Sequence, residues 1–323
     1  MKNFILFFIS LFFALFITEI IVAYVVSYPK YGVSSRVYGL HGFTSPQNVY
    51  LPYSEYWTVE GKNKVYKRNN LGFPGADVDT GLGHKYIYVV GNSYVQAYEV
   101  EPDSMATSIL NLKIKNKFSS LSVLNLGRGD QDVYDSYFKC LYYEKYYEPS
   151  LIFIILDNTN KEVLLRHSKP LSFETSVNFG KEDKSFLMNT HNCLRNKSTF
   201  INLVAKFLYD NWSTVTGKKE NNAEDINPYT KTEDHTYLSE DLFRCLNELN
   251  RKYGNKFVLV SIIASKEINS KLSDFCSTSG INFTSGEINT AKYKLSGWGH
   301  LTNEGNRLFG ELLYESFIKY YSE

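Results

Sequence analysis

Residues 86–93 read YIYVVGNS, an apolar run of aromatic and β-branched side chains that stops at Gly91 and is followed by Asn92 and Ser93. Such side chains favour a buried strand, and glycine permits a turn that most residues resist. A serine at the carboxyl end of a strand in an open α/β sheet lies where catalytic groups collect. The alternative for Ser93 is a purely structural role as the cap of the next helix.

Three further apolar runs, at residues 123–126, 151–156 and 257–263, have the character of buried strands. Apolar residues at helical spacing separate and follow these runs. The helices predicted from this spacing cover residues 104–116, 133–147, 239–253, 268–276 and a C-terminal stretch after residue 300. Strands that alternate with helices imply a parallel sheet covered on both faces, so we expect an α/β fold.

Length and composition agree with one sizeable domain plus appendages, since the chain has 323 residues of which 43% are hydrophobic. The net charge of +1 excludes a general nucleic-acid binder, which needs a basic face. The four cysteines, Cys140, Cys193, Cys245 and Cys276, form no CxxC pair and no metal-like spacing with histidine. We therefore expect no metal and no cofactor, and we place Cys140 and Cys245 on buried helix faces.

The N-terminal stretch is strongly apolar, because residues 4–26 read FILFFISLFFALFITEIIVAYVV. As a helix it would be about 34 Å long at 1.5 Å per residue, enough to cross a bilayer. We expect a transmembrane anchor at 1–27 and a domain held outside the cytoplasm, in the periplasm or at the cell surface. A cleavable signal peptide is the alternative.

The rest of the chain divides into three parts by its patterning. Residues 28–68 show little periodicity and are expected to form a connector, whereas 69–323 carry the α/β domain. Within that domain, residues 161–237 are more polar and less regular, which indicates an insertion rather than a second core.

Four candidate catalytic residues fall on turns that follow a strand or precede a helix: Ser93, Gly129, Asn160 and His300. In a parallel sheet these turns share the carboxyl edge, so residues distant in sequence meet there. Serine attack on an acyl carbonyl needs a histidine base and donors aimed at the developing oxyanion. The backbone N–H groups of Ser93 and Gly129, with the Asn160 amide, are candidates for that donor set.

Five sequence blocks carry a family resemblance: "NNLGFPG", "YVVGNSYVQAYEV", "SVLNLGRGDQ", "PSLIFIILDNTN" and "GWGHLTNEGNRLFGELLYESF". In their order and spacing the chain resembles the SGNH (GDSL-like) hydrolase superfamily, and in particular its membrane-anchored bacterial members. The resemblance implies a three-layer, flavodoxin-like parallel sheet. It also implies that Ser93 is the nucleophile, His300 the base, and Gly129 and Asn160 the oxyanion donors.

Several residues depart from the family pattern. Asn92 stands where the first block usually has an aspartate, and its amide can still hold the turn. The second block is one residue short, which leaves Gly127 as the alternative to Gly129. Asn158 is the alternative to Asn160 in the third block.

The largest departure concerns the acid that orients the base. The family usually places an aspartate three residues before the catalytic histidine, and here that position is Gly297. A backbone carbonyl, a water molecule or a remote acid must then orient the imidazole of His300. Asp157 is a candidate surrogate, although a hydrogen-bonded turn role fits it better. Trp298 is a candidate wall of the substrate pocket, with a packing role as the equal alternative.

The resemblance implies a serine esterase or O-acyltransferase that acts through Ser93 and His300 without the usual aspartate. The implied partner is an acylated carbohydrate or other ester, in particular the O-acetyl groups of cell-surface glycans, and not a nucleic acid. The alternative, motivated by Gly297 and Asn92, is a catalytically degenerate domain that serves in glycan binding or envelope assembly. An α/β-hydrolase is excluded because its Gly-x-Ser-x-Gly elbow would need glycine at Val95.

Overall fold

The computed structural model describes residues 2–24, 52–53, 55–57, 65–81, 83–129, 131–157, 200, 204, 238–295 and 299–321. The expected insertion at 161–237 lies almost wholly outside these residues and stays a prediction.

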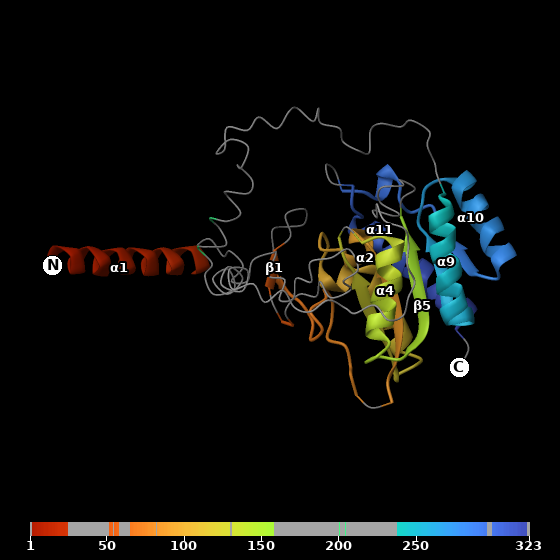
Figure 1. The fold of residues 1–323 in the computed structure, drawn as a ribbon, viewed down its shortest axis with the longest axis horizontal. Helices are drawn as coiled ribbons and strands as arrows, with labels where there is room; N and C mark the ends of the chain where they lie inside the picture. Colours follow the sequence, from red (N-terminus) through yellow and green to blue (C-terminus); the bar gives the residue numbers. More distant parts are fainter. Residues whose placement is uncertain are drawn as a thin grey trace.

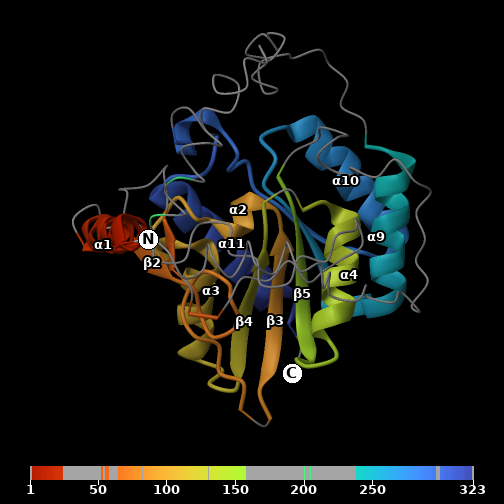
Figure 2. The same ribbon diagram turned by 60° about the vertical axis from the view of Figure 1, so that its left-hand side comes forward.

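The centre of the fold is a parallel sheet of five strands in the order β4-β3-β5-β6-β7. Figure 1 shows this sheet among the helices, and Figure 2 shows β4, β3 and β5 side by side. The strands are β3 (Lys85–Gly91), β4 (Leu121–Gly127), β5 (Pro149–Leu156), β6 (Phe257–Ser261) and β7 (Asn282–Ser285). If these five strands are numbered 1 to 5 along the chain, their order across the sheet is 2-1-3-4-5, which is the order of flavodoxin-like folds. The predicted α/β class with a parallel sheet is therefore confirmed.

Helices cover both faces of the sheet, so the domain has three layers (Figure 2). The helices α4 (Val133–Tyr143), α9 (Glu240–Tyr253) and α10 (Lys266–Ser279) share one core cluster, whereas α3 (Ala106–Lys115) and α11 (Asn303–Tyr320) share the other. The strands supply both clusters by alternation, since Tyr88 and Val90 face the first and Ile87 and Val89 face the second.

Short elements complete the connections. They are the one-turn helix α2 (Ser93–Gln96) and the 3₁₀ turns η1 (Pro102–Ser104), η2 (Gly254–Lys256) and η3 (Ala291–Tyr293). As predicted, Cys140 and Cys245 are buried on helices, and both are free thiols.

An antiparallel hairpin lies within the stretch expected to be a connector. Its strands are β1 (Glu55–Trp57) and β2 (Val65–Lys67), and Tyr56 pairs with Tyr66 across them. The side chain of Tyr56 is fully buried. This hairpin therefore packs as part of the domain rather than as a free linker.

The N-terminal apolar stretch forms the helix α1 (Lys2–Tyr24), which projects from the domain (Figure 1). Most of its large apolar side chains are exposed. Among the described residues, no helix combines the length and the apolarity that crossing a bilayer requires, so the predicted transmembrane span is not confirmed.

Candidate active site

Ser93 is the first residue of α2 and lies directly beyond the carboxyl end of β3. Asn92 caps this helix, because its Oδ1 accepts a hydrogen bond from the backbone N–H of Tyr94 at 3.0 Å. A Cβ at Gly91 would lie 2.7 Å from Val95 Cγ2, so only glycine allows the strand to turn this closely into the helix. The sharp turn projects Ser93 from the sheet edge.

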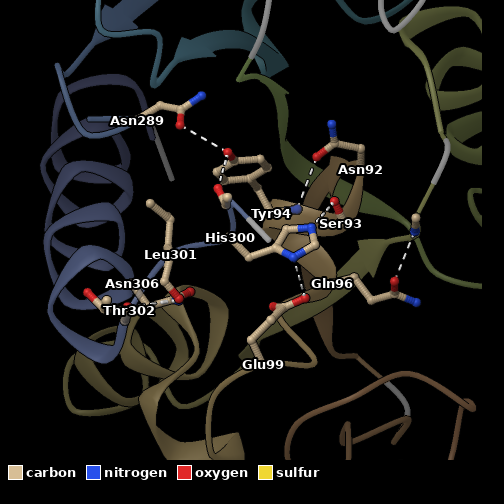
Figure 3. Close-up of polar contacts among 12 residues, drawn as sticks. Asn92, Ser93, Tyr94, Gln96, Glu99, Asn289, His300, Leu301, Thr302 and Asn306 are labelled. Atoms are coloured by element: carbon tan, nitrogen blue, oxygen red, sulfur yellow. Dashed lines mark hydrogen bonds and ion pairs between the residues drawn. The ribbon is translucent and has the colours of Figure 1, made fainter. Parts of the chain in front are cut away.

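His300 reaches Ser93 from the loop that precedes α11, 207 residues further along the chain. Its Nε2 lies 2.9 Å from Ser93 Oγ (Figure 3). The loop is closed at its base, since Leu295 donates its N–H to the His300 carbonyl at 2.7 Å and Lys294 forms a β-bridge with Leu301. The two residues that the sequence assigned as nucleophile and base are therefore brought together.

The other ring nitrogen of His300 faces a residue that sequence analysis did not identify. His300 Nδ1 lies 3.2 Å from Glu99 Oε1, and the Glu99 side chain is only 9% exposed. Figure 3 shows the imidazole between Ser93 and Glu99. A carboxylate at Nδ1 holds the proton on that nitrogen, which leaves the Nε2 lone pair directed at the serine hydroxyl.

Glu99 reaches this position because α2 ends after a single turn. Ala97 adopts the left-handed conformation, with φ 51° and ψ 42°, and its N–H closes the turn on the Ser93 carbonyl. The chain is thereby redirected, and Glu99, six positions after the nucleophile, faces the imidazole. Ser93 and Glu99 therefore belong to one short segment.

Asp157, the surrogate acid considered from the sequence, has a different partner. Asn92 Nδ2 lies 2.8 Å and 2.9 Å from the two carboxylate oxygens of Asp157, which is buried. Burial raises the pKa of Asp157, and the hydrogen bond from Asn92 and the charge of His300 partly offset that rise. Asp157 thus holds the nucleophile turn, as expected of a hydrogen-bonded turn residue.

Tyr94 connects the nucleophile helix to the histidine loop. Its hydroxyl lies 2.6 Å from the carbonyl oxygen of Gly299, to which it donates, and 3.0 Å from Asn289 Oδ1. The Tyr94 ring meets the His300 ring edge to face, with 5.7 Å between the centroids. These contacts fix the imidazole relative to Ser93.

The two glycines considered as oxyanion donors lie beside α2. The N–H of Gly129 donates to Gln96 Oε1 at 2.9 Å, and the N–H of Gly127 donates to Asn125 Oδ1 at 3.0 Å. Gly129 would serve an oxyanion once the Gln96 amide released its N–H. The N–H of Ser93, at the first position of α2, has no acceptor within that helix.

The remaining predicted site residues, Asn158, Asn160 and Trp298, lie outside the described residues, as does Gly297. Their assigned roles stay predictions.

Comparison with known proteins finds no matching family model and no curated protein of significant sequence similarity. Solved structures do match. The esterase EstA from Pseudoalteromonas sp. has 11% identity and a TM-score of 0.42, and the match covers 73% of this chain and 97% of that chain. The sequence blocks, the strand order and the Ser93–His300 contact all agree with the family resemblance described for the sequence. The chain resembles the SGNH hydrolases.

Two further matching structures are also described as an esterase or a lipolytic protein. A member of the lipolytic protein G-D-S-L family from Veillonella parvula has 13% identity and a TM-score of 0.37, over 73% of this chain and 99% of that one. A two-domain esterase active on acetylated mannans has 10% identity and a TM-score of 0.40, over 74% of this chain and 50% of that one. The assignment of the SGNH-like site rests on this chain's own geometry.

Proposed function

We propose that this protein is a serine esterase or O-acyltransferase in which Ser93 is the nucleophile, His300 the base and Glu99 the acid. One observation carries the proposal: the two ring nitrogens of His300 lie 2.9 Å from Ser93 Oγ and 3.2 Å from Glu99 Oε1. This is the arrangement that acyl transfer through serine requires.

In the proposed reaction His300 Nε2 takes the proton of Ser93 as Oγ bonds to the acyl carbon. The resulting oxyanion is stabilised by the N–H of Ser93, with Gly129 and Asn160 as the further proposed donors. His300 then returns the proton to the departing alkoxide, which leaves Ser93 acylated. Water, or a sugar hydroxyl in a transferase, then gives its proton to His300 as its oxygen bonds to the acyl carbon. The bond between the acyl carbon and Ser93 Oγ breaks, and His300 returns the proton to Oγ, which restores the free serine.

Glu99 completes this cycle without taking a proton. It keeps the Nδ1–H of His300 in place and stabilises the imidazolium that forms in each half-reaction. The acid that the family places three residues before the histidine is therefore not needed at Gly297.

The proposed substrate class is O-acetyl groups on cell-surface glycans, and it rests on the resemblance of the sequence blocks. The proposed location outside the cytoplasm rests on the apolar composition of residues 4–26. Fractionation of cells expressing the full chain, followed by protease treatment of intact spheroplasts, tests the location. Protection of the domain from the protease would rule that location out.

A serine-reactive fluorophosphonate probe and p-nitrophenyl acetate test the catalytic proposal. We expect the wild type to be labelled and to hydrolyse the ester, and Ser93→Ala and His300→Ala to lose both activities. Ser270→Ala, an exposed serine on α10, is the matched control and should behave as the wild type. If the wild type is neither labelled nor active while it binds acetylated glycan, the non-catalytic alternative is favoured.

The same assay separates hydrolysis from transfer. An acyl donor is supplied with and without an oligosaccharide acceptor, and the products are analysed by mass spectrometry. An acylated acceptor identifies a transferase, whereas free acid in both reactions identifies an esterase.

A further inference from the structure

A buried arginine lies behind the turn that carries the acid. Arg68 directly follows β2 and is 1% exposed. Its guanidinium carbon lies 5.1 Å from the ring centroid of Tyr56 and 5.5 Å from that of Tyr98. Its Nε–H donates to the Tyr98 hydroxyl at 3.2 Å, and the two tyrosine rings lie 4.6 Å apart.

The charge of this arginine needs compensation, because a guanidinium removed from water is costly unless anions or π-faces surround it. Glu99 immediately follows Tyr98 in the chain, and its carboxylate is also mostly buried. Burial is the main cause of the raised pKa of Tyr56. The charge of Arg68 lowers this pKa and the charge of Glu99 raises it, so both charges act on the same phenol. Arg68 and Glu99 therefore belong to one buried environment.

We propose that Arg68 is a positioning residue for catalysis: it anchors the Tyr98–Glu99 turn to the β1–β2 hairpin and supplies the positive charge that keeps Glu99 ionised and directed at His300. This inference rests on the proposed function. It assigns the hairpin, which the sequence suggested was a connector, a part in the active site.

Loss of the Arg68 charge should shift the pH dependence of kcat/KM toward higher pH. Without Arg68, the negative charge of Glu99 at His300 Nδ1 is less compensated, which stabilises the imidazolium and raises the pKa of His300. Partial protonation of Glu99 would also remove the acceptor at low pH. Both effects move the acidic limb of the kcat/KM profile to higher pH, whereas a purely structural anchor would lower activity without moving that limb.

The experiment measures kcat/KM for p-nitrophenyl acetate against pH with the full chain. For Arg68→Gln we expect a fall of about 10- to 100-fold near neutral pH and an acidic limb displaced upward by about 0.5–1 pH unit. Arg68→Lys keeps the charge but loses the planar fork, so its rate should fall while its limb stays near that of the wild type.

Two further variants separate the contributions. Tyr98→Phe removes the hydroxyl that accepts the hydrogen bond from Arg68 and should lower kcat a few-fold without moving the limb. Lys67→Gln removes the exposed neighbouring charge and should match the wild type. If Arg68→Gln does not fold in a thermal melt, Arg68→Met takes its place in the pH profile, and a folded charge-free variant whose acidic limb keeps the wild-type position would overturn the proposal.

The inference and the proposed function fail in different ways. A rate that depends on Ser93 but shows no limb displacement in a folded Arg68→Gln variant overturns the inference alone. A rate that survives Ser93→Ala removes the proposed function, and this inference falls with it.

Discussion

At the scale of single residues, the two ring nitrogens of His300 have separate partners, and Glu99 contacts the nitrogen that does not face Ser93. Glu99→Gln keeps the shape of the side chain but presents an amide that favours the wrong imidazole tautomer. We expect kcat to fall by about 10²–10⁴-fold, in line with loss of the triad acid in serine proteases. Steady-state kinetics check this, with the exposed Glu287→Gln as the unaffected control. Unchanged kcat would exclude Glu99 from the mechanism.

The pairing of Asn92 with Asp157 gives a second prediction at this scale. Asn92→Asp restores the usual family block but places two carboxylates against each other in a buried site. We expect a loss of about 2–4 kcal/mol in the free energy of unfolding at neutral pH, recovered as the pH falls and the pair shares a proton.

The double variant Asn92→Asp with Asp157→Asn tests this interpretation, because it exchanges donor and acceptor and should recover most of the lost stability. Urea unfolding of the three variants at pH 5 and pH 7 measures the effect. A double variant as unstable as Asn92→Asp would show that the pair is not the cause.

Sequence analysis at this scale identified Ser93 and His300 because turns after apolar runs mark the edge of a sheet. It missed Glu99 for a physical reason. The position of that carboxylate depends on the left-handed backbone at Ala97, and alanine gives no local sign of such a conformation. A carboxylate within a few residues of the nucleophile was the available signal.

At the scale of elements, α2 and β4 approach so closely that Gly127 has no room for a side chain. An added Cβ would lie 2.3 Å from the backbone nitrogen of Gln96. Gly127→Ala should therefore lower the free energy of unfolding by about 3 kcal/mol or more. Gly129→Ala is the matched control, because its Cβ would lie 3.5 Å from Gln96 Oε1, an ordinary contact. Urea unfolding compares the two, and equal losses would contradict the prediction.

Lys139 joins α4 to the carboxyl end of β4. Its ammonium is buried, and it donates to the Leu126 carbonyl at 2.9 Å and to Gln131 Oε1. Burial, with a smaller contribution from the charge of Arg128, lowers the pKa of Lys139 from 10.5 to about 7. The folded protein therefore loses this proton at a pH where the unfolded chain still holds it.

Because the unfolded chain then binds more protons, Lys139 makes the free energy of unfolding rise with pH above about 7. The full penalty of the buried charge applies below that pH. Relative to Lys139→Met, the wild type should gain about 2–3 kcal/mol between pH 7 and pH 9. Urea unfolding of both proteins at several pH values measures the difference. A difference independent of pH would show that the lysine keeps its ordinary pKa.

Elements with a strong apolar pattern were predictable, and the others were not. The β3, β4, β5 and β6 strands are almost wholly buried, so their residues form apolar runs. The edge strand β7 reads NFTS and is partly exposed, which leaves no such run. The β1–β2 hairpin was missed because three-residue strands are too short to show a period.

At the scale of the whole molecule, the core on one face of the sheet, under α4, α9 and α10, encloses the thiols Cys140, Cys245 and Cys276. Burial raises the pKa of all three, which suppresses the reactive thiolate. We expect these thiols to react with iodoacetamide only when the domain unfolds. Peptide mapping by mass spectrometry across a urea series checks this, and rapid labelling of the three in native buffer would contradict the described packing.

The general architecture could be inferred from the sequence because alternating strands and helices allow few arrangements. The strand order places the turns after β3 and β4 at one edge, where Ser93 and Gly129 were expected. The packing of the hairpin on the domain was not inferable, since it depends on contacts of Tyr56 and Arg68 with Tyr98 that leave no periodic pattern in the sequence.

If the proposed function holds, the location of Ser93 and Glu99 on one short segment has a consequence for how the site can change in evolution. Where the family pattern has its aspartate three residues before the histidine, that stretch must both supply the acid and position the imidazole. Under the proposed function Glu99 supplies the acid, so the stretch before His300 need not supply one. Its amino acids are open to selection for new acceptors, and libraries randomised at positions 296–298 should retain turnover far more often than libraries randomised at 97–99.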